Sequence, residues 1–96
     1  TKTEYVLSKQ LLRSGTSIGA NTEEAIGAQS TKDFLAKISI AYKEARETLY
    51  WLRLLNDSQI IAQEQYKDLS KDLDQILKIL GKIQITLKRK LDRVNS

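Results

Sequence analysis

Cysteine, histidine, methionine and proline are all missing from this sequence, and the first two absences remove most of the side chains that enzymes use. Without cysteine no disulfide framework can form, which suits a reducing compartment. Without histidine and cysteine, one chain cannot build a Ser-His or Cys-His nucleophile pair, or a thiolate or imidazole metal site. The Glu-x-x-His pairs of di-metal helical bundles are absent too. We therefore expect no enzymatic activity, no catalytic residue, no metal and no cofactor.

Carboxylate groups are the remaining candidates for catalysis. They gather at three places: Glu23 with Glu24, Glu44 with Glu47, and Asp68 with Asp72 and Asp74. Lysine and arginine alternate with them, which is typical of solvated or salt-bridged helix positions. An acid-base pair is the alternative interpretation and is much less favoured. Glycine is scarce as well, and Gly15, Gly19 and Gly27 fit neither a GxGxxG nor a Walker A phosphate loop.

Long apolar runs are also lacking. No run approaches the roughly 18 residues that a membrane span needs, and the first residues lack the apolar core of a signal peptide. We therefore expect a soluble, cytoplasmic protein with no membrane association. The 96 residues suffice for a single domain, 1–96. Sixteen Lys and Arg against twelve Asp and Glu give a formal charge of +4, which permits an acidic partner.

What the sequence does contain is helical periodicity, clearest from about Thr31 to Asn56. Its stripe, with alternating steps of four and three, consists of Phe34, Ile38, Ala41, Ala45, Thr48, Leu52 and Leu55. Ser30 with Asp33 resembles a capping box and predicts a helix start near Thr31. The turn-forming residues from Asn56 to Ser58 predict its end.

A second stripe begins at about Gln63 and repeats the same steps. It consists of Tyr66, Leu69, Leu73, Ile76, Leu80, Ile83 and Leu87. Further apolar residues lie off this stripe, namely Leu77, Ile79, Ile85 and Leu91. Because this apolar surface is too wide for one partner, the last helix is predicted to contact more than one neighbouring helix.

The first segment is less regular. Its apolar residues predict a helix from about Glu4 to Arg13, which Gly15 and Gly19 should interrupt or bend before it ends near Gly27. Short connections then make successive helices antiparallel neighbours. The predicted fold is all-α, an antiparallel up-down helical bundle whose core is open on one side. A buried polar layer joining Asn21 or Glu24 to Arg46 is a further hypothesis.

Basic residues crowd the last part of the final helix. The candidates for nucleic-acid binding there are Lys78, Lys82, Lys88, Arg89, Lys90 and Arg93, with Arg46 and Arg53 less certain. The alternative is that cations near a helix C-terminus merely complement the helix dipole. Among the aromatic residues, Tyr50 and Trp51 mark either a subunit interface or ordinary core packing.

The segment from Gln10 to Leu55 resembles a known family. Its marks are Arg13-Ser14, SIGAN from Ser17 to Asn21, Glu23-Glu24-Ala25, Ser30 to Phe34, and EARETLYWLRLL from Glu44 to Leu55. These are similar to the four-helix bundle family of bacterial 23S rRNA intervening-sequence proteins, which is related to the accessory variability protein of diversity-generating retroelements. The resemblance implies a homopentamer, with nucleic-acid binding proposed for some members.

Two departures from the family pattern stand out. Members usually carry one more helix before the Tyr5 segment, so this chain resembles the family without its first helix. Position 19 is Gly where many relatives have Pro. An absent first helix would leave the apolar face open, to be covered by that segment or by another chain.

Two functions are therefore expected from the sequence. The first is a non-enzymatic homo-oligomer, a pentamer by resemblance, that binds RNA or DNA without base specificity through the basic residues. The alternative is an adaptor, accessory to a nucleic-acid enzyme, that captures a protein partner through Tyr50, Trp51 and Leu54 and does not touch nucleic acid.

Overall fold

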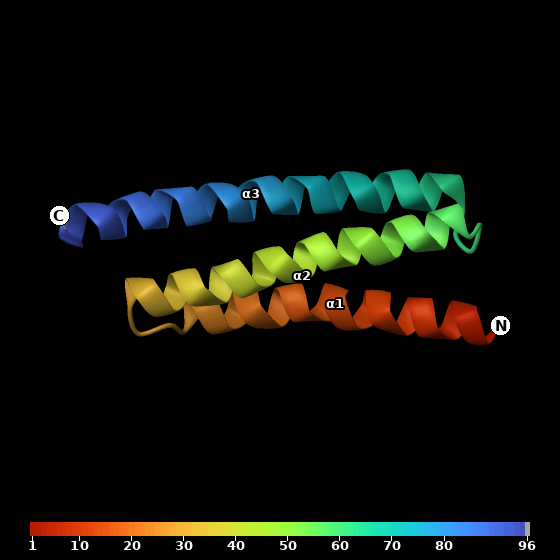
Figure 1. Cartoon of the computed structure of the whole chain (residues 1–96), viewed down its shortest axis with the longest axis horizontal. Coiled ribbons are helices and arrows are strands. Elements are labelled where there is room, and N and C mark those ends of the chain that lie inside the picture. The colour runs from red at the N-terminus through yellow and green to blue at the C-terminus, as the bar shows by residue number, and fades with distance from the viewer. Residues whose placement is uncertain (96) are drawn as a thin grey trace.

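The computed structural model describes residues 1–95 and contains three long helices. They are α1 (Lys2–Ile26), α2 (Thr31–Asp57) and α3 (Gln63–Asn95). The helices run side by side in alternating directions, with α2 in the middle (Figure 1). The all-α prediction is confirmed, and the described residues form three helices rather than a complete four-helix bundle. In this part of the chain, no helix is both long enough and apolar enough to cross a membrane.

Helix α2 separates the other two. Both α1 and α3 pack against it, whereas within residues 1–95 no Cα atom of α1 lies within 8 Å of one in α3. The molecule is therefore elongated, with extents of 53 × 20 × 17 Å. Within residues 1–95, α2 is the one helix that packs against α3, so the predicted second neighbour of α3 is not found inside a single chain. The surplus apolar surface of α3 is left uncovered instead.

Capping residues set where the first two helices begin. The hydroxyl of Thr1 accepts a hydrogen bond from the Glu4 backbone N–H at 3.2 Å, in a capping box with the Glu4 side chain. The hydroxyl of Ser30 accepts one from the Asp33 backbone N–H at 3.0 Å, which confirms the predicted start of α2. At the other end α2 stops at Asp57, and Gln59 follows with a φ of 60°. The capping hydrogen bonds of Thr1 and Ser30 each satisfy a backbone N–H that the first turn of a helix would otherwise leave unpaired.

The core lies on the two sides of α2. Six of the seven residues in its predicted stripe are buried, namely Ile38, Ala41, Ala45, Thr48, Leu52 and Leu55. Small residues dominate the contact with α1, whose buried side chains are Ser14 and Ala25. Among the α3 residues whose burial is described, Leu73 and Leu80 are the buried ones, while Leu69 of the same predicted stripe is 45% exposed. The α3 stripe therefore divides between the core and an open side of the molecule.

Helix α1 passes through its glycines without a break. Of the two predicted outcomes, interruption at Gly15 and Gly19 is wrong, because α1 is continuous from Lys2 to Ile26, and the predicted end near Gly27 is confirmed. A helical glycine costs only about 1 kcal/mol relative to alanine, and packing along α2 outweighs this cost.

Replacing Gly19 with alanine should stabilise the protein. A Cβ atom at this exposed position would meet nothing within 4 Å, so the gain in helix propensity is not offset by a clash. We expect Gly19→Ala to raise the free energy of unfolding by about 0.5–1 kcal/mol, measured by urea unfolding. Gly27→Ala, just beyond the helix, is the control. It should change the free energy of unfolding by only a few tenths of the change expected for Gly19→Ala. A destabilised Gly19→Ala protein would show that the helix is not continuous in solution, or that something packs on Gly19.

Candidate functional site

A polar cluster joins α1 to α2 in the middle of the molecule. The Arg13 guanidinium lies 3.6 Å from the Glu44 carboxylate and also pairs with Glu47. Glu47 in turn accepts a hydrogen bond from the Trp51 indole N–H at 3.1 Å. Beside this cluster, the buried Thr48 hydroxyl donates to Ser14 Oγ at 2.9 Å. These contacts hold two helices in register and leave the carboxylates paired, so they resemble a structural clamp more than a catalytic pair.

The predicted polar layer around Arg46 does not form. Arg46 is exposed on α2, Asn21 donates within its own helix to the Ser17 carbonyl at 2.9 Å, and Glu24 pairs with Lys37 at 2.9 Å. The hydrogen bond from Lys37 to Glu24, together with the carboxylate's charge, raises the pKa of Lys37 above its usual value. The arginine that does join α1 to α2 is Arg13, which pairs with Glu44 and Glu47 on the surface rather than in a buried layer.

The predicted interface residues Tyr50, Trp51 and Leu54 share one end of α2. Tyr50 is 53% exposed and its ring meets the Trp51 ring edge-on, with 5.0 Å between centroids. Trp51 and Leu54 are half-buried. Trp51 lies off the core stripe by its place in the helical repeat, and its indole N–H donates to Glu47. Their role as an interface stays a prediction.

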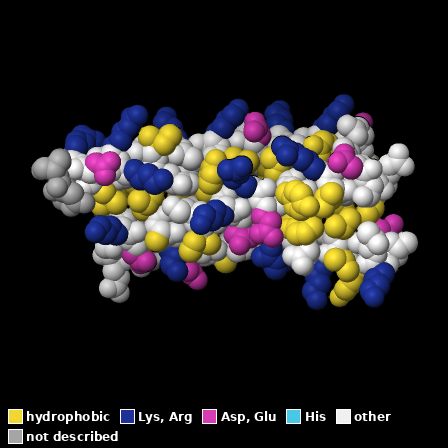
Figure 2. Space-filling model, viewed as in Figure 1, with side chains coloured by type: hydrophobic (Ala, Val, Ile, Leu, Met, Phe, Trp, Pro, Cys, Tyr) yellow, Lys and Arg dark blue, Asp and Glu magenta, His cyan; other side chains and the backbone are white. Residues whose placement is uncertain are grey.

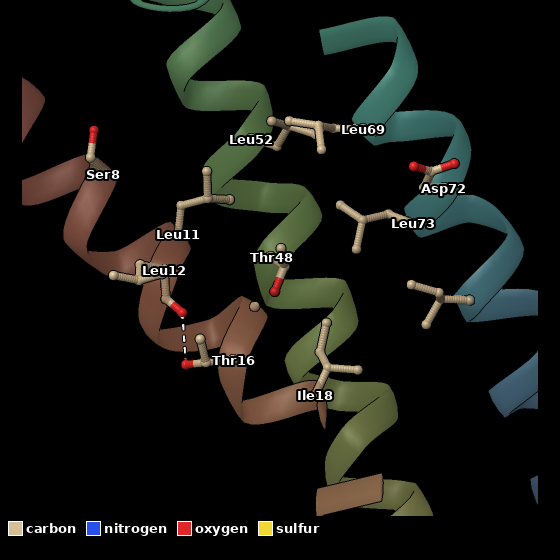
Figure 3. A pocket seen from close by; sticks show the side chains of 12 residues that line it. Ser8, Leu11, Leu12, Thr16, Ile18, Thr48, Leu52, Leu69, Asp72 and Leu73 are labelled. Atoms are coloured by element: carbon tan, nitrogen blue, oxygen red, sulfur yellow. Dashed lines mark hydrogen bonds between the residues drawn. The ribbon is translucent and has the colours of Figure 1, made fainter. Parts of the chain in front are cut away.

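An apolar groove runs between α1 and α3 on one face of the molecule, with a volume of about 440 Å³. Leu11, Leu12 and Ile18 form one wall, Leu69, Leu73 and Ile76 form the other, and Thr48 with Leu52 forms the floor (Figure 3). We call this the α1–α3 groove. It exists because α2 holds the other two helices apart. Leu12 is 67% exposed there, so the groove presents the kind of surface that a further helix covers in a bundle.

Cations gather along the contact between α2 and α3. Two shallow hollows follow this contact, of about 430 and 600 Å³, and Asp74 borders both. The cations that line them are Arg53, Lys67, Lys71, Lys78, Lys82 and Arg89. We call these six residues the basic seam. Figure 2 shows Lys and Arg side chains continuing along the α3 edge, at the top of the view. With six cations around one carboxylate, the seam is strongly positive.

The structure divides the six residues predicted to bind nucleic acid. Lys78, Lys82 and Arg89 come together in one hollow of the seam, and Arg93 follows Arg89 one turn later as an exposed side chain. Because each residue turns the helix by about 100°, Lys88 and Lys90 project to either side of Arg89 and leave the seam. The structure therefore brings three of the six residues together in one hollow, and nucleic-acid binding by the six stays a prediction.

Sequence reasoning missed Lys67 and Lys71. They were overlooked because the prediction followed local crowding of charge near the end of α3, whereas the seam follows one side of the helix. Their spacing of 11 residues from Lys78 and Lys82 was the signal that could have found them. Of the two less certain candidates on α2, Arg53 lines the seam and Arg46 lines neither hollow. Among the described residues, no three Asp or Glu side chains lie close enough together to hold a metal ion.

Known proteins resemble this chain in sequence and in structure. The family described as 23S rRNA-intervening sequence protein matches residues 1–82, which include α1, α2 and most of α3. A solved structure of a protein of unknown function, from the S23 ribosomal protein family of Bacteroides thetaiotaomicron, is 52% identical and superposes with a TM-score of 0.82. That match covers 88% of this chain and 78% of the other. No curated protein matches the chain.

Proposed function

This chain belongs to the 23S rRNA-intervening sequence protein family, and we propose that it is a cytoplasmic, non-enzymatic, oligomeric helical-bundle protein that binds RNA or DNA without base specificity. The basic seam is the observation that carries this proposal. Its five α3 cations are all exposed, and they share a surface with Arg53 of α2. Cations that contact phosphates release condensed counterions, which gives sequence-independent affinity that falls steeply with salt.

Non-specific binding fits the seam better than base readout does. Readout of base edges needs side chains that reach into a groove and form paired hydrogen bonds, as Asn, Gln and Arg do. Four of the six seam cations are lysines, which act as flexible point charges. Each lysine contact is weak, so several copies of the chain in one assembly would strengthen binding through multivalency.

The α1–α3 groove supports the proposal of self-assembly. Its walls are the uncovered parts of two amphipathic helices, including Leu12 and Leu69, which are 67% and 45% exposed. A continuous apolar surface of this kind marks an interaction site. We propose that a helix of another copy of this chain occupies it and completes a four-helix arrangement. The resemblance to the family makes a homopentamer the expected assembly.

An adaptor function is the second candidate. The same groove and the exposed Tyr50 ring favour it, because apolar and aromatic surfaces supply most of the energy in protein interfaces. An adaptor would capture its partner with little dependence on salt, whereas phosphate binding depends on salt strongly.

Light scattering after size exclusion, with and without a short RNA, tests the proposed function. We expect a species near five times the 10.9 kDa of one chain that takes up RNA at about 50 mM salt and loses most of it at about 200 mM. The triple variant Lys78→Gln/Lys82→Gln/Arg89→Gln should keep this mass and bind RNA about tenfold more weakly. A monomer that ignores RNA would overturn both parts of the proposal. An oligomer that ignores RNA would leave the adaptor function.

A further inference from the structure

The cations of α3 have a regular spacing. Lys67, Lys78 and Arg89 are 11 residues apart, and so are Lys71 and Lys82. Eleven residues of an α-helix rise about 16.5 Å and turn through about three full turns plus 20°. The five cations therefore return to one side of α3, within an arc of about 60°, in groups that repeat about every 16.5 Å.

This repeat matches the outside of a nucleic-acid double helix. One turn of duplex DNA is about 34–36 Å long and carries two phosphate backbones. A straight line along its side therefore crosses a backbone every 17–18 Å or so on average. A straight helix laid along the duplex would bring one cation group to each of three successive crossings. The unequal widths of the two grooves shift individual crossings, and the flexible lysine side chains can follow that shift.

From this match we propose that α3 lies along the outside of a DNA double helix, parallel to its axis, with the seam against three successive backbone crossings. The crossings would be met by Lys67 with Lys71, by Lys78 with Lys82, and by Arg89. This inference rests on the proposed function and names double-stranded DNA as the nucleic acid that the seam binds.

The residues between the cation groups agree with this placement. Asp74 lies midway between the two lysine pairs, on the same side of α3, and Ile85 lies 11 residues later, between Lys82 and Arg89. In the proposed arrangement both face a groove of the duplex, where there is no phosphate. A carboxylate is tolerated there because no phosphate lies opposite it. The Asp74 carboxylate lies 3.4 Å from the Lys78 ammonium nitrogen and can orient the Lys78 side chain.

Two other ways of binding nucleic acid fit the seam less well. A helix inserted into the major groove meets phosphates on both of its flanks, whereas the seam cations of α3 occupy one side. Single strands are held by stacking bases on exposed aromatic rings. The aromatic residues bordering the seam, Tyr42 and Tyr66, are both half-buried. A Cβ atom placed on Gly81 would lie 3.6 Å from the Tyr42 ring, so Tyr42 packs on α3 itself.

Fluorescence anisotropy with two DNA probes of equal phosphate number tests the inference. The probes are a duplex of about 24 base pairs and an oligo-dT strand of about 48 nucleotides, both at about 50 mM salt. We expect the full chain to bind the duplex at least about tenfold more tightly than the strand, with AT-rich and GC-rich duplexes within about twofold of each other.

Two double variants with the same charge change locate the contact. Lys78→Gln/Lys82→Gln removes the middle group of the seam and should weaken duplex binding about tenfold, while lowering the slope of log K against log salt by about 2. Lys88→Gln/Lys90→Gln removes two exposed lysines that lie off the seam. This variant should weaken duplex binding less than about threefold. All four positions are exposed, so both variants should fold, which circular dichroism can check.

The possible failures are distinguishable. Equal binding of the single strand and the duplex would overturn this inference and leave the proposed function standing. Equal losses of duplex affinity in the two double variants would also overturn this inference, because binding would then depend on net charge rather than on the seam. An oligoglutamate peptide that competes as well as the duplex at equal charge would show an acidic protein partner instead. Absence of binding to any nucleic acid would overturn the proposed function, and this inference with it.

Discussion

Leu52→Ala is expected to lower the free energy of unfolding by about 2–5 kcal/mol, the largest effect of any single truncation proposed for this chain. Leu52 is only 1% exposed and lies on the middle helix, where it forms the floor of the α1–α3 groove. Truncation removes apolar contacts and leaves a cavity, and α2 cannot shift to fill it without losing its packing against the other two helices. Urea unfolding followed by circular dichroism measures the change.

Leu12→Ala is the matched control for this truncation. The same side chain is removed from a groove wall where it is 67% exposed, so a monomeric chain should lose less than about 0.5 kcal/mol. In the proposed oligomer, where another copy covers the groove, the loss should approach that of Leu52→Ala. If both variants lose the same amount, the groove is covered in solution and Leu12 belongs to an interface. If Leu52→Ala changes stability by less than about 1 kcal/mol, the packing around α2 is not as described.

Ala45→Leu should destabilise the protein by about 1–3 kcal/mol through overpacking. Ala45 is completely buried at 0% exposure and packs with Ala25, Ile38, Ala41 and Leu80. Small residues allow α2 to lie close to its neighbours at this point, and a leucine would have to push a helix away or adopt a strained rotamer. The temperature of the unfolding midpoint measures the effect, and we expect it to fall by several degrees.

Ala36→Leu provides the comparison, because it makes the same substitution on an exposed position of the same helix. Alanine and leucine have similar helix propensities, so stability should change by less than about 0.5 kcal/mol. Were Ala45→Leu as stable as this control, the contact around Ala45 would have to be looser than the structure describes. A destabilised Ala36→Leu would instead point to a contact on the outer side of α2.

Much of the fold could be predicted because helix periodicity is local. The alternating steps of four and three placed Ile38, Ala41, Ala45, Thr48, Leu52 and Leu55 on one stripe, and all six are buried. The start of α2 followed from Ser30 and Asp33, whose contact spans only three residues. The family resemblance, carried by Gln10 to Leu55, rested on the same segment and is confirmed by the match over residues 1–82.

The candidate site was less predictable because it depends on direction around the helix as well as on sequence distance. Lys88, Arg89 and Lys90 are neighbours in sequence but point to three different sides of α3. Lys67 and Arg89 are 22 residues apart and share one side. Local charge density therefore found part of the seam and missed Lys67 and Lys71. Arg53 could be added only once α2 was known to pack beside α3.

The sequence by itself determined that this protein is made of three amphipathic helices, where α2 begins and ends, and which residues of α2 face the core, because these depend on contacts within a few residues. Only the tertiary structure decided that α2 separates α1 from α3, that Arg13 pairs with Glu47 across 34 residues, and that Leu69 of the α3 stripe stays exposed. An apolar face requires burial but does not name its partner, since the hydrophobic effect is non-directional. Which faces meet is settled only by the packing of whole helices.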